Sequence, residues 1–106
     1  MGWSNRVGPG VFQQKIDAIL GLGAMPRSGG SGAIALAEVA CGRQDGYLEM
    51  SINLWDVAAA LVLLEEAGAR VSPFLRDGGL EGDATILAAA PHIADALSRA
   101  VGVSMD

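Results

Sequence analysis

The sequence is poor in cysteine, in aromatic side chains and in charge, and each shortage excludes a class of protein. The lone cysteine, Cys41, excludes an intramolecular disulfide framework and favours a cytoplasmic location. Only 5% of the residues are aromatic and 18% are charged, whereas 51% are hydrophobic, which is too apolar for a disordered segment. Because the seven basic residues are scattered and the net charge is −5, we expect no nucleic-acid polymer as partner.

Long hydrophobic runs are also absent. The longest, Val57 to Leu64, is far too short to cross a bilayer. No basic region followed by an apolar stretch marks a targeting signal, so we expect no membrane partner. The 106 residues suit one domain, residues 1–106, which falls just inside the size range of an independent core.

What the sequence does contain is an alternation of strand and helix patterns. Helices are expected at residues 11–20, 33–41, 55–67 and 92–101, and extended segments at 2–6, 25–27, 47–52, 70–74 and 85–89. Residues 76–83, rich in glycine and acid, are expected to form a loop. This order predicts an α/β layered domain with a mixed, mostly parallel sheet flanked by helices. The 55–67 helix is apolar on every side, so we expect it to be buried on every side.

Two carboxylates are candidates for a site. Asp56 falls in the first turn of the 55–67 helix, where the helix dipole favours an acid, and a rigidly placed carboxylate there is also a ligand for a hard cation such as Mg²⁺. Glu49 lies on the preceding strand and reaches the same rim if a tight connection follows. Spacing alone favours the simpler structural interpretation for both: Asp56 as a charge at a helix end, and Glu49 as a solvent-facing strand residue.

A glycine-rich segment, residues 29–33, opens the second expected helix. Its bare N–H groups allow close approach of an anion, with Ser31 as the helix cap, although a capped helix after a turn explains the same residues. The spacing fits neither a P-loop nor a dinucleotide fingerprint. His92 has no partner at metal-ligand spacing and is expected at the surface. Cys41 is expected to be a small core residue within its helix.

Several short elements between residues 30 and 71 stand in a characteristic order. They are Gly-Ser-Gly-Ala at 30–33, Gly-Arg-Gln-Asp-Gly-Tyr at 42–47, Trp-Asp-Val-Ala-Ala at 55–59 and Glu-Ala-Gly at 66–68. Together they resemble the C-terminal signature of the inositol monophosphatase family, whose members are Mg²⁺-dependent, lithium-sensitive phosphatases. The segment at 2–6 is similar to that family's strand and Ser-x-Arg turn, so the resemblance covers nearly the whole chain.

The resemblance implies roles for particular residues and a fold equivalent to the C-terminal half of that family's fold. Asp56 matches an aspartate that binds a catalytic metal, and Glu49 matches an acid that hydrogen-bonds a polyol. Ser31, Gly32 and Ala33 match a loop that lines the substrate pocket, with Gly32 where many members carry alanine. The expected cofactor is Mg²⁺, and the expected substrate is a small phosphorylated polyol or a related phosphate ester.

The resemblance also shows what is missing. The family's first half carries a glutamate-rich metal-ligand segment and an Asp-x-x-Asp-Gly-Thr type motif, and no Asp-Gly-Thr occurs here. We therefore expect a piece of a longer protein or the product of a truncated gene, with no catalytic residue assigned in this half and no phosphatase activity alone. We also expect association through an exposed apolar face, with itself or with an N-terminal half.

Other activities fit the same motifs. They include related members acting on nucleotide bisphosphates, fructose bisphosphate or histidinol phosphate. From another class, a non-catalytic binding or interaction module is the alternative.

Overall fold

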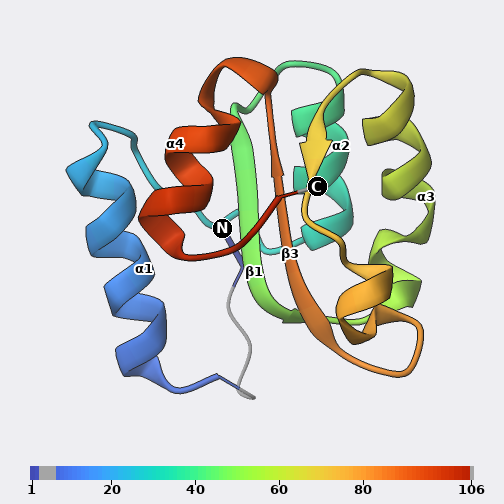
Figure 1. The fold of residues 1–106 in the computed structure, drawn as a ribbon, viewed down its shortest axis with the longest axis horizontal. Helices are drawn as coiled ribbons and strands as arrows, with labels where there is room; N and C mark the ends of the chain where they lie inside the picture. Colours follow the sequence, from blue (N-terminus) through green and yellow to red (C-terminus); the bar gives the residue numbers. More distant parts are fainter. Residues whose placement is uncertain (3–6, 106) are drawn as a thin grey trace.

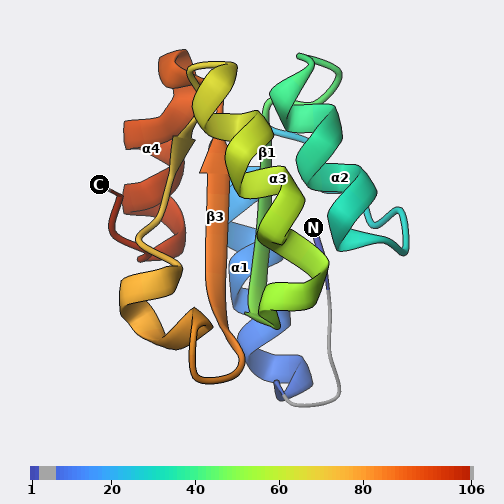
Figure 2. The same cartoon turned by 90° about the vertical axis from the view of Figure 1, so that its right-hand side faces the viewer.

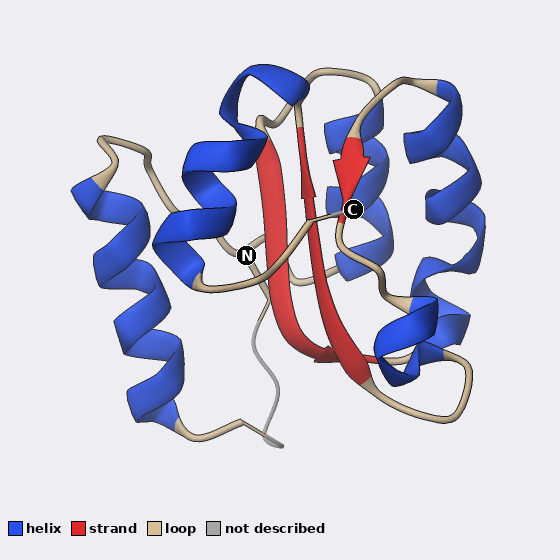
Figure 3. Cartoon of the chain, viewed as in Figure 1, coloured by secondary structure: helices blue, strands red, loops and turns tan. Residues whose placement is uncertain are grey.

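A layered arrangement of helices on both faces of a sheet defines the computed structural model, which describes residues 1–2 and 7–105 (Figure 1). In chain order the elements are α1 (Pro9–Gly21), α2 (Gly32–Ala40), β1 (Gly46–Ile52), α3 (Leu54–Glu66), β2 (Arg70–Val71), the helical turn η1 (Leu75–Gly79), β3 (Ala84–Ala89) and α4 (Pro91–Val101). Helices α1 and α4 cover one face of the sheet, and α2 and α3 cover the other (Figures 1 and 3). The predicted α/β layered class is confirmed. Most of the extended piece expected at 2–6 lies outside the described residues.

The strand pairing corrects the expectation of a mostly parallel sheet. The described sheet has three strands in the order β1-β3-β2, and both neighbouring pairs are antiparallel. Strands β1 and β2 do run in the same direction, because α3 carries the chain back between them. However, β3 lies between them and runs the opposite way, so the two parallel strands never pair.

Two hydrophobic clusters, one on each face, hold the layers together. Strand β3 is central and contributes alternate residues to both: Ile86 and Ala88 pack toward α2 and α3, whereas Leu87 and Ala89 pack toward α1 and α4. All four are fully buried. The short apolar strand is therefore buried on both faces, which is the usual position of a continuous apolar run inside a layered fold.

Helix α3 is only half buried, so the expectation that it would be buried all round is wrong. Val57, Ala60 and Leu64 face the core, but Trp55 is 94% exposed and Val62 is 60% exposed. Figure 2 looks onto this face and shows α3 as the outermost layer there. The outer side of the helix is apolar by sequence and is exposed because no layer among the described residues covers it. No helix in the part of the chain described here is both long and apolar enough to cross a bilayer.

Other local differences follow from where elements end. Helix α2 ends at Ala40, so Cys41 is the exposed cap residue after it, and the expectation of a core cysteine is wrong. The strand expected at 70–74 is confined to β2. At Ser72 the side-chain hydroxyl, in place of a backbone carbonyl, accepts the hydrogen bond from Leu87 N–H at 2.9 Å, so the regular pairing with β3 ends there. The loop expected at 76–83 begins instead as the helical turn η1, and no strand forms at 25–27. His92 is exposed, as expected.

Candidate functional site

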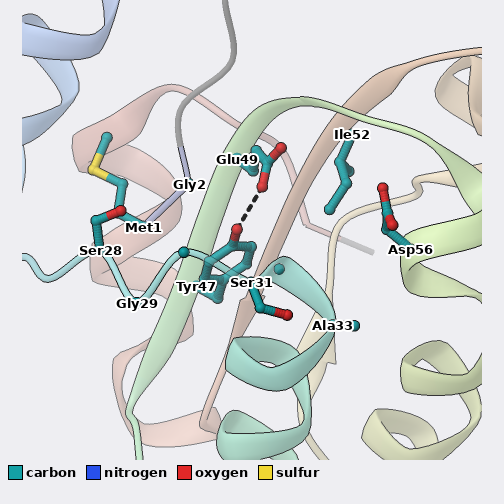
Figure 4. Close-up of a pocket in the computed structure, with 12 residues that line it drawn as sticks. Met1, Gly2, Ser28, Gly29, Ser31, Ala33, Tyr47, Glu49, Ile52 and Asp56 are labelled. Atoms are coloured by element: carbon teal, nitrogen blue, oxygen red, sulfur yellow. Dashed lines mark hydrogen bonds between the residues drawn. The ribbon is translucent and has the colours of Figure 1, made fainter.

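A cavity of about 410 Å³ opens where the first turns of α2 and α3 meet strand β1. It contains all the residues that the sequence singles out as metal or substrate ligands, and Figure 4 shows them around it. Its lining is Met1, Gly2, Ser28, Gly29, Gly30, Ser31, Gly32, Ala33, Tyr47, Glu49, Ile52 and Asp56. The expected rim of Glu49 and Asp56 beside residues 31–33 is therefore present, although the roles of these residues stay predictions.

Glu49 reaches the cavity because of its position on β1. Side chains alternate along a strand, so Tyr47 and Glu49 share one face while Leu48 packs into the cluster on the other. The Tyr47 hydroxyl donates to Glu49 Oε1 at 2.5 Å (Figure 4). Burial, followed by this contact with the Glu49 carboxylate, raises the pKa of the Tyr47 phenol far above its ordinary value. The phenol therefore stays protonated near neutral pH and can donate to Glu49.

An irregularity in β1 brings a further side chain to the same cavity. The pairing of β1 with β3 shifts register between Glu49 and Ile52, and Thr85 donates its hydroxyl to the Met50 carbonyl at 2.9 Å inside this stretch. Strict alternation would place Ile52 with Leu48 on the other face. The shift instead places Ile52 on the Tyr47 side, where it lines the cavity. Bulges of this kind commonly re-aim side chains near functional sites.

Asp56 enters the cavity from the first turn of α3. Asn53 caps this helix, and its side-chain oxygen accepts from the Asp56 N–H at 3.3 Å. The Asp56 side chain is left exposed at a helix N-terminus, where the dipole stabilises a carboxylate by about 0.3–1 kcal/mol. The helix-end role and a ligand role are compatible, because the backbone holds the residue while the carboxylate stays available.

The segment from Ser28 to Ala33 forms the wall opposite. Gly30 has φ of +86°, a left-handed conformation that favours glycine, and this turn leads the chain into α2. Ser31 caps α2 by accepting from Ile34 N–H at 3.3 Å, which leaves its own hydroxyl proton free to donate into the cavity. The N-terminus of α2 therefore faces the cavity with its positive dipole end.

Two glycines pack closely against the Tyr47–Glu49 pair. A methyl group added at Gly2 would overlap Glu49 Oε1 and the Tyr47 hydroxyl. One added at Gly32 would lie 2.7 Å from Ile52 Cδ1 and 3.1 Å from the Tyr47 hydroxyl. Backbone at both glycines therefore lies close to the pair, and the absence of a side chain at Gly2 and Gly32 leaves room for the Tyr47–Glu49 contact.

The donors at the cavity would supply only part of the ligands that a Mg²⁺ ion needs. Within the described residues, no three Asp, Glu, His or Cys side chains lie together closely enough to hold a metal ion. The Asp56 carboxylate offers the oxygen ligands that Mg²⁺ prefers. In Glu49, by contrast, one carboxylate oxygen already accepts a hydrogen bond from Tyr47. At this cavity the described residues therefore offer one suitable ligand, and a complete site would need further carboxylates.

Tyr47 and Ile52 line the cavity but were not among the predicted site residues. Tyr47 stands two positions before Glu49, and this period-two spacing was a usable signal that both share a face. Ile52 carried no such signal, because its orientation depends on the register shift, which alternation alone does not predict.

Comparison with known proteins identifies the family. A model of the inositol monophosphatase family matches residues 3–104, so the chain belongs to that family. It is similar to inositol-1-monophosphatase of Mycobacterium leprae, with 44% identity over 72 residues, 68% of this chain and 25% of that protein.

Solved structures of the family share the fold. The extragenic suppressor protein suhB of Bartonella henselae matches with a TM-score of 0.77 and 29% identity, covering 94% of this chain and 39% of that one. Inositol monophosphatase of Anabaena matches with a TM-score of 0.69 and 42% identity, covering 86% of this chain and 36% of that one. The chain thus spans well under half the length of these relatives.

Proposed function

We propose that this chain forms part of the substrate and metal site of a Mg²⁺-dependent phosphate monoesterase acting on a small phosphorylated polyol or a related ester. The observation that carries the proposal is the cavity in which Asp56, Glu49 and residues 31–33 meet. By the resemblance, these residues correspond to the family's ligand positions, and they come from three separate elements. Membership of the inositol monophosphatase family supports the same reaction class.

Each residue has a role that its geometry permits. Asp56 would contribute one carboxylate to a bound Mg²⁺, which when bound supplies Lewis-acid activation of water and stabilisation of the leaving oxygen. Glu49, with Oε1 fixed by Tyr47, has Oε2 left to accept a hydrogen bond from a ligand hydroxyl. Ser31 and the N–H groups at the start of α2 would bind the anionic side of the ligand.

The described residues cannot complete this chemistry by themselves. One available carboxylate binds Mg²⁺ only weakly, since the ion dehydrates reluctantly and needs several oxygen donors. By the family resemblance, the remaining ligands belong to the part of the longer relatives that lies outside the match. We therefore propose that the chain alone is inactive and that the lone exposed cysteine reflects a cytoplasmic location.

A chimaera tests this proposal. Residues 1–106 replace the matching part of the Anabaena relative, which supplies the rest of the fold. With Mg²⁺, we expect phosphate release from inositol monophosphate, and a panel of nucleotide, fructose and histidinol phosphates will define the substrate class. The 106-residue chain alone should release none. A chimaera that folds, as judged by circular dichroism, yet hydrolyses no ester in the panel would contradict the proposal.

A further inference from the structure

The contact between Tyr47 and Glu49 joins a core side chain to the wall of the cavity. Tyr47 is only 4% exposed and packs in the core between the sheet and α2 and α3, while its hydroxyl ends at the cavity wall. There it donates to Glu49 Oε1 at 2.5 Å. The backbone at Gly2 and Gly32 packs close to the same two side chains, and a methyl group at Gly2 would overlap both of them.

A glutamate without such a partner samples several rotamers, and binding a ligand through it costs conformational entropy. Here one carboxylate oxygen is already engaged. The other oxygen is left as an acceptor toward the cavity, and the phenol remains a donor because it does not ionise near neutral pH. The arrangement therefore prepares Glu49 to receive a hydroxyl donor.

We propose that Tyr47 is a positioning residue: its hydroxyl holds the Glu49 carboxylate so that the second oxygen points to the ligand. The identity of the ligand as a polyol ester is taken from the function proposed above, and this part of the inference rests on it. Tyr47 itself does not touch the reacting atoms. If the contact were only structural, removing the hydroxyl would lower stability and leave ligand affinity unchanged.

The contact can be tested on the 106-residue chain without any activity. Tyr47 is its single tyrosine, so the alkaline rise of tyrosinate absorbance reports this residue alone. In the folded chain the midpoint should lie above the ordinary value of about 10. Glu49→Gln removes the negative charge and should lower the midpoint by about one pH unit, with circular dichroism showing that the fold persists. A midpoint unchanged by Glu49→Gln would overturn the inference.

The positioning role is tested in the Anabaena chimaera. Tyr47→Phe should raise KM about 5- to 10-fold, a loss typical of one positioned polar contact, while kcat changes less than about twofold. In a Glu49→Gln background, the same change should have no further effect on KM, because Tyr47 acts through Glu49. Ser72→Ala is the matched control, since it removes a buried hydroxyl bond outside the cavity and should leave KM unchanged.

The two proposals fail differently. A folded chimaera with no hydrolysis would contradict the proposed function, and the tyrosine titration would still decide the contact. The positioning role would be overturned by an active chimaera in which Tyr47→Phe leaves KM unchanged. It would also be overturned if Tyr47→Phe raised KM by the same factor in the parent chimaera and in the Glu49→Gln background.

Discussion

Replacing Gly32 by alanine tests how closely side chains pack at the cavity wall. The contacts around Gly32 allow the change in the free energy of unfolding to be estimated. Gly32 is the first residue of α2 and has no positive φ, so alanine fits the backbone and should gain about 0.4–1 kcal/mol from reduced freedom of the unfolded chain. The added methyl would, however, lie 2.7 Å from Ile52 Cδ1. Overpacking of this kind costs about 1–3 kcal/mol, so Gly32→Ala should destabilise by about 1 kcal/mol net.

Removing the opposing methyl should lower this cost. Ile52→Val deletes Cδ1 and alone should cost about 0.5–1.5 kcal/mol. In that background the contacts of the added methyl with the Tyr47 hydroxyl (3.1 Å) and Glu49 Oε1 (3.3 Å) remain, so Gly32→Ala should cost less than in the parent chain. The expected coupling is about 1 kcal/mol in a double-mutant cycle measured by urea unfolding. Gly10→Ala is the matched control, because a methyl there, near the start of α1, meets nothing within 4 Å and should only stabilise. Additive effects of Gly32→Ala and Ile52→Val would refute the packing argument.

Other consequences can be checked separately. Trp55→Gln should weaken self-association of the chain by at least about tenfold in sedimentation, since an exposed tryptophan is a typical interface anchor; a clean monomer before mutation would contradict this. Ser72→Ala leaves a buried N–H of β3 unpaired and should cost about 1–3 kcal/mol in urea unfolding, and a neutral result would show that water replaces the hydroxyl. A hydrogen bond from Arg70 holds the pKa of the Asp95 carboxyl below its ordinary value. The pair therefore stabilises the fold fully at pH values above the unfolded carboxyl's pKa of about 3.9, and this stabilisation is lost as the pH falls through the lower pKa of the folded state. Asp95→Asn should therefore flatten the acid limb of stability against pH, and an unchanged limb would contradict it.

Local signals in the sequence predicted the elements around the site well. Helices α2 and α3 begin within two residues of the expected positions, because Ser31 and Asn53 are side-chain caps whose effect is confined to one turn. Strand β1 was equally clear from its alternation and the preceding Asp-Gly turn. These elements bring Glu49, Asp56 and residues 31–33 together at one cavity. That these residues form a site was predicted from the family resemblance, because spacing alone favoured structural roles for them.

The features that could not be predicted depend on long-range partners. Insertion of β3 between β1 and β2 is a matter of pairing across the sheet, and helix–strand alternation alone suggested parallel neighbours. The register shift that turns Ile52 into the cavity also arises from pairing with β3. Similarly, an apolar sequence predicts that α3 must be covered, but it does not say which chain segment covers it.

The central claim is that Asp56 supplies a metal ligand to a site that this chain shares with the rest of a longer fold. The most direct measurement compares Mg²⁺-dependent phosphate release by the Anabaena chimaera and by its Asp56→Asn variant, with Glu66→Gln at the far end of α3 as the charge-matched control. Asp56→Asn should lower the rate by about 100-fold and shift the Mg²⁺ dependence to higher concentration, whereas Glu66→Gln should leave both unchanged. An Asp56→Asn variant that hydrolyses the ester at the parent rate, with the parent's Mg²⁺ dependence, would contradict the claim.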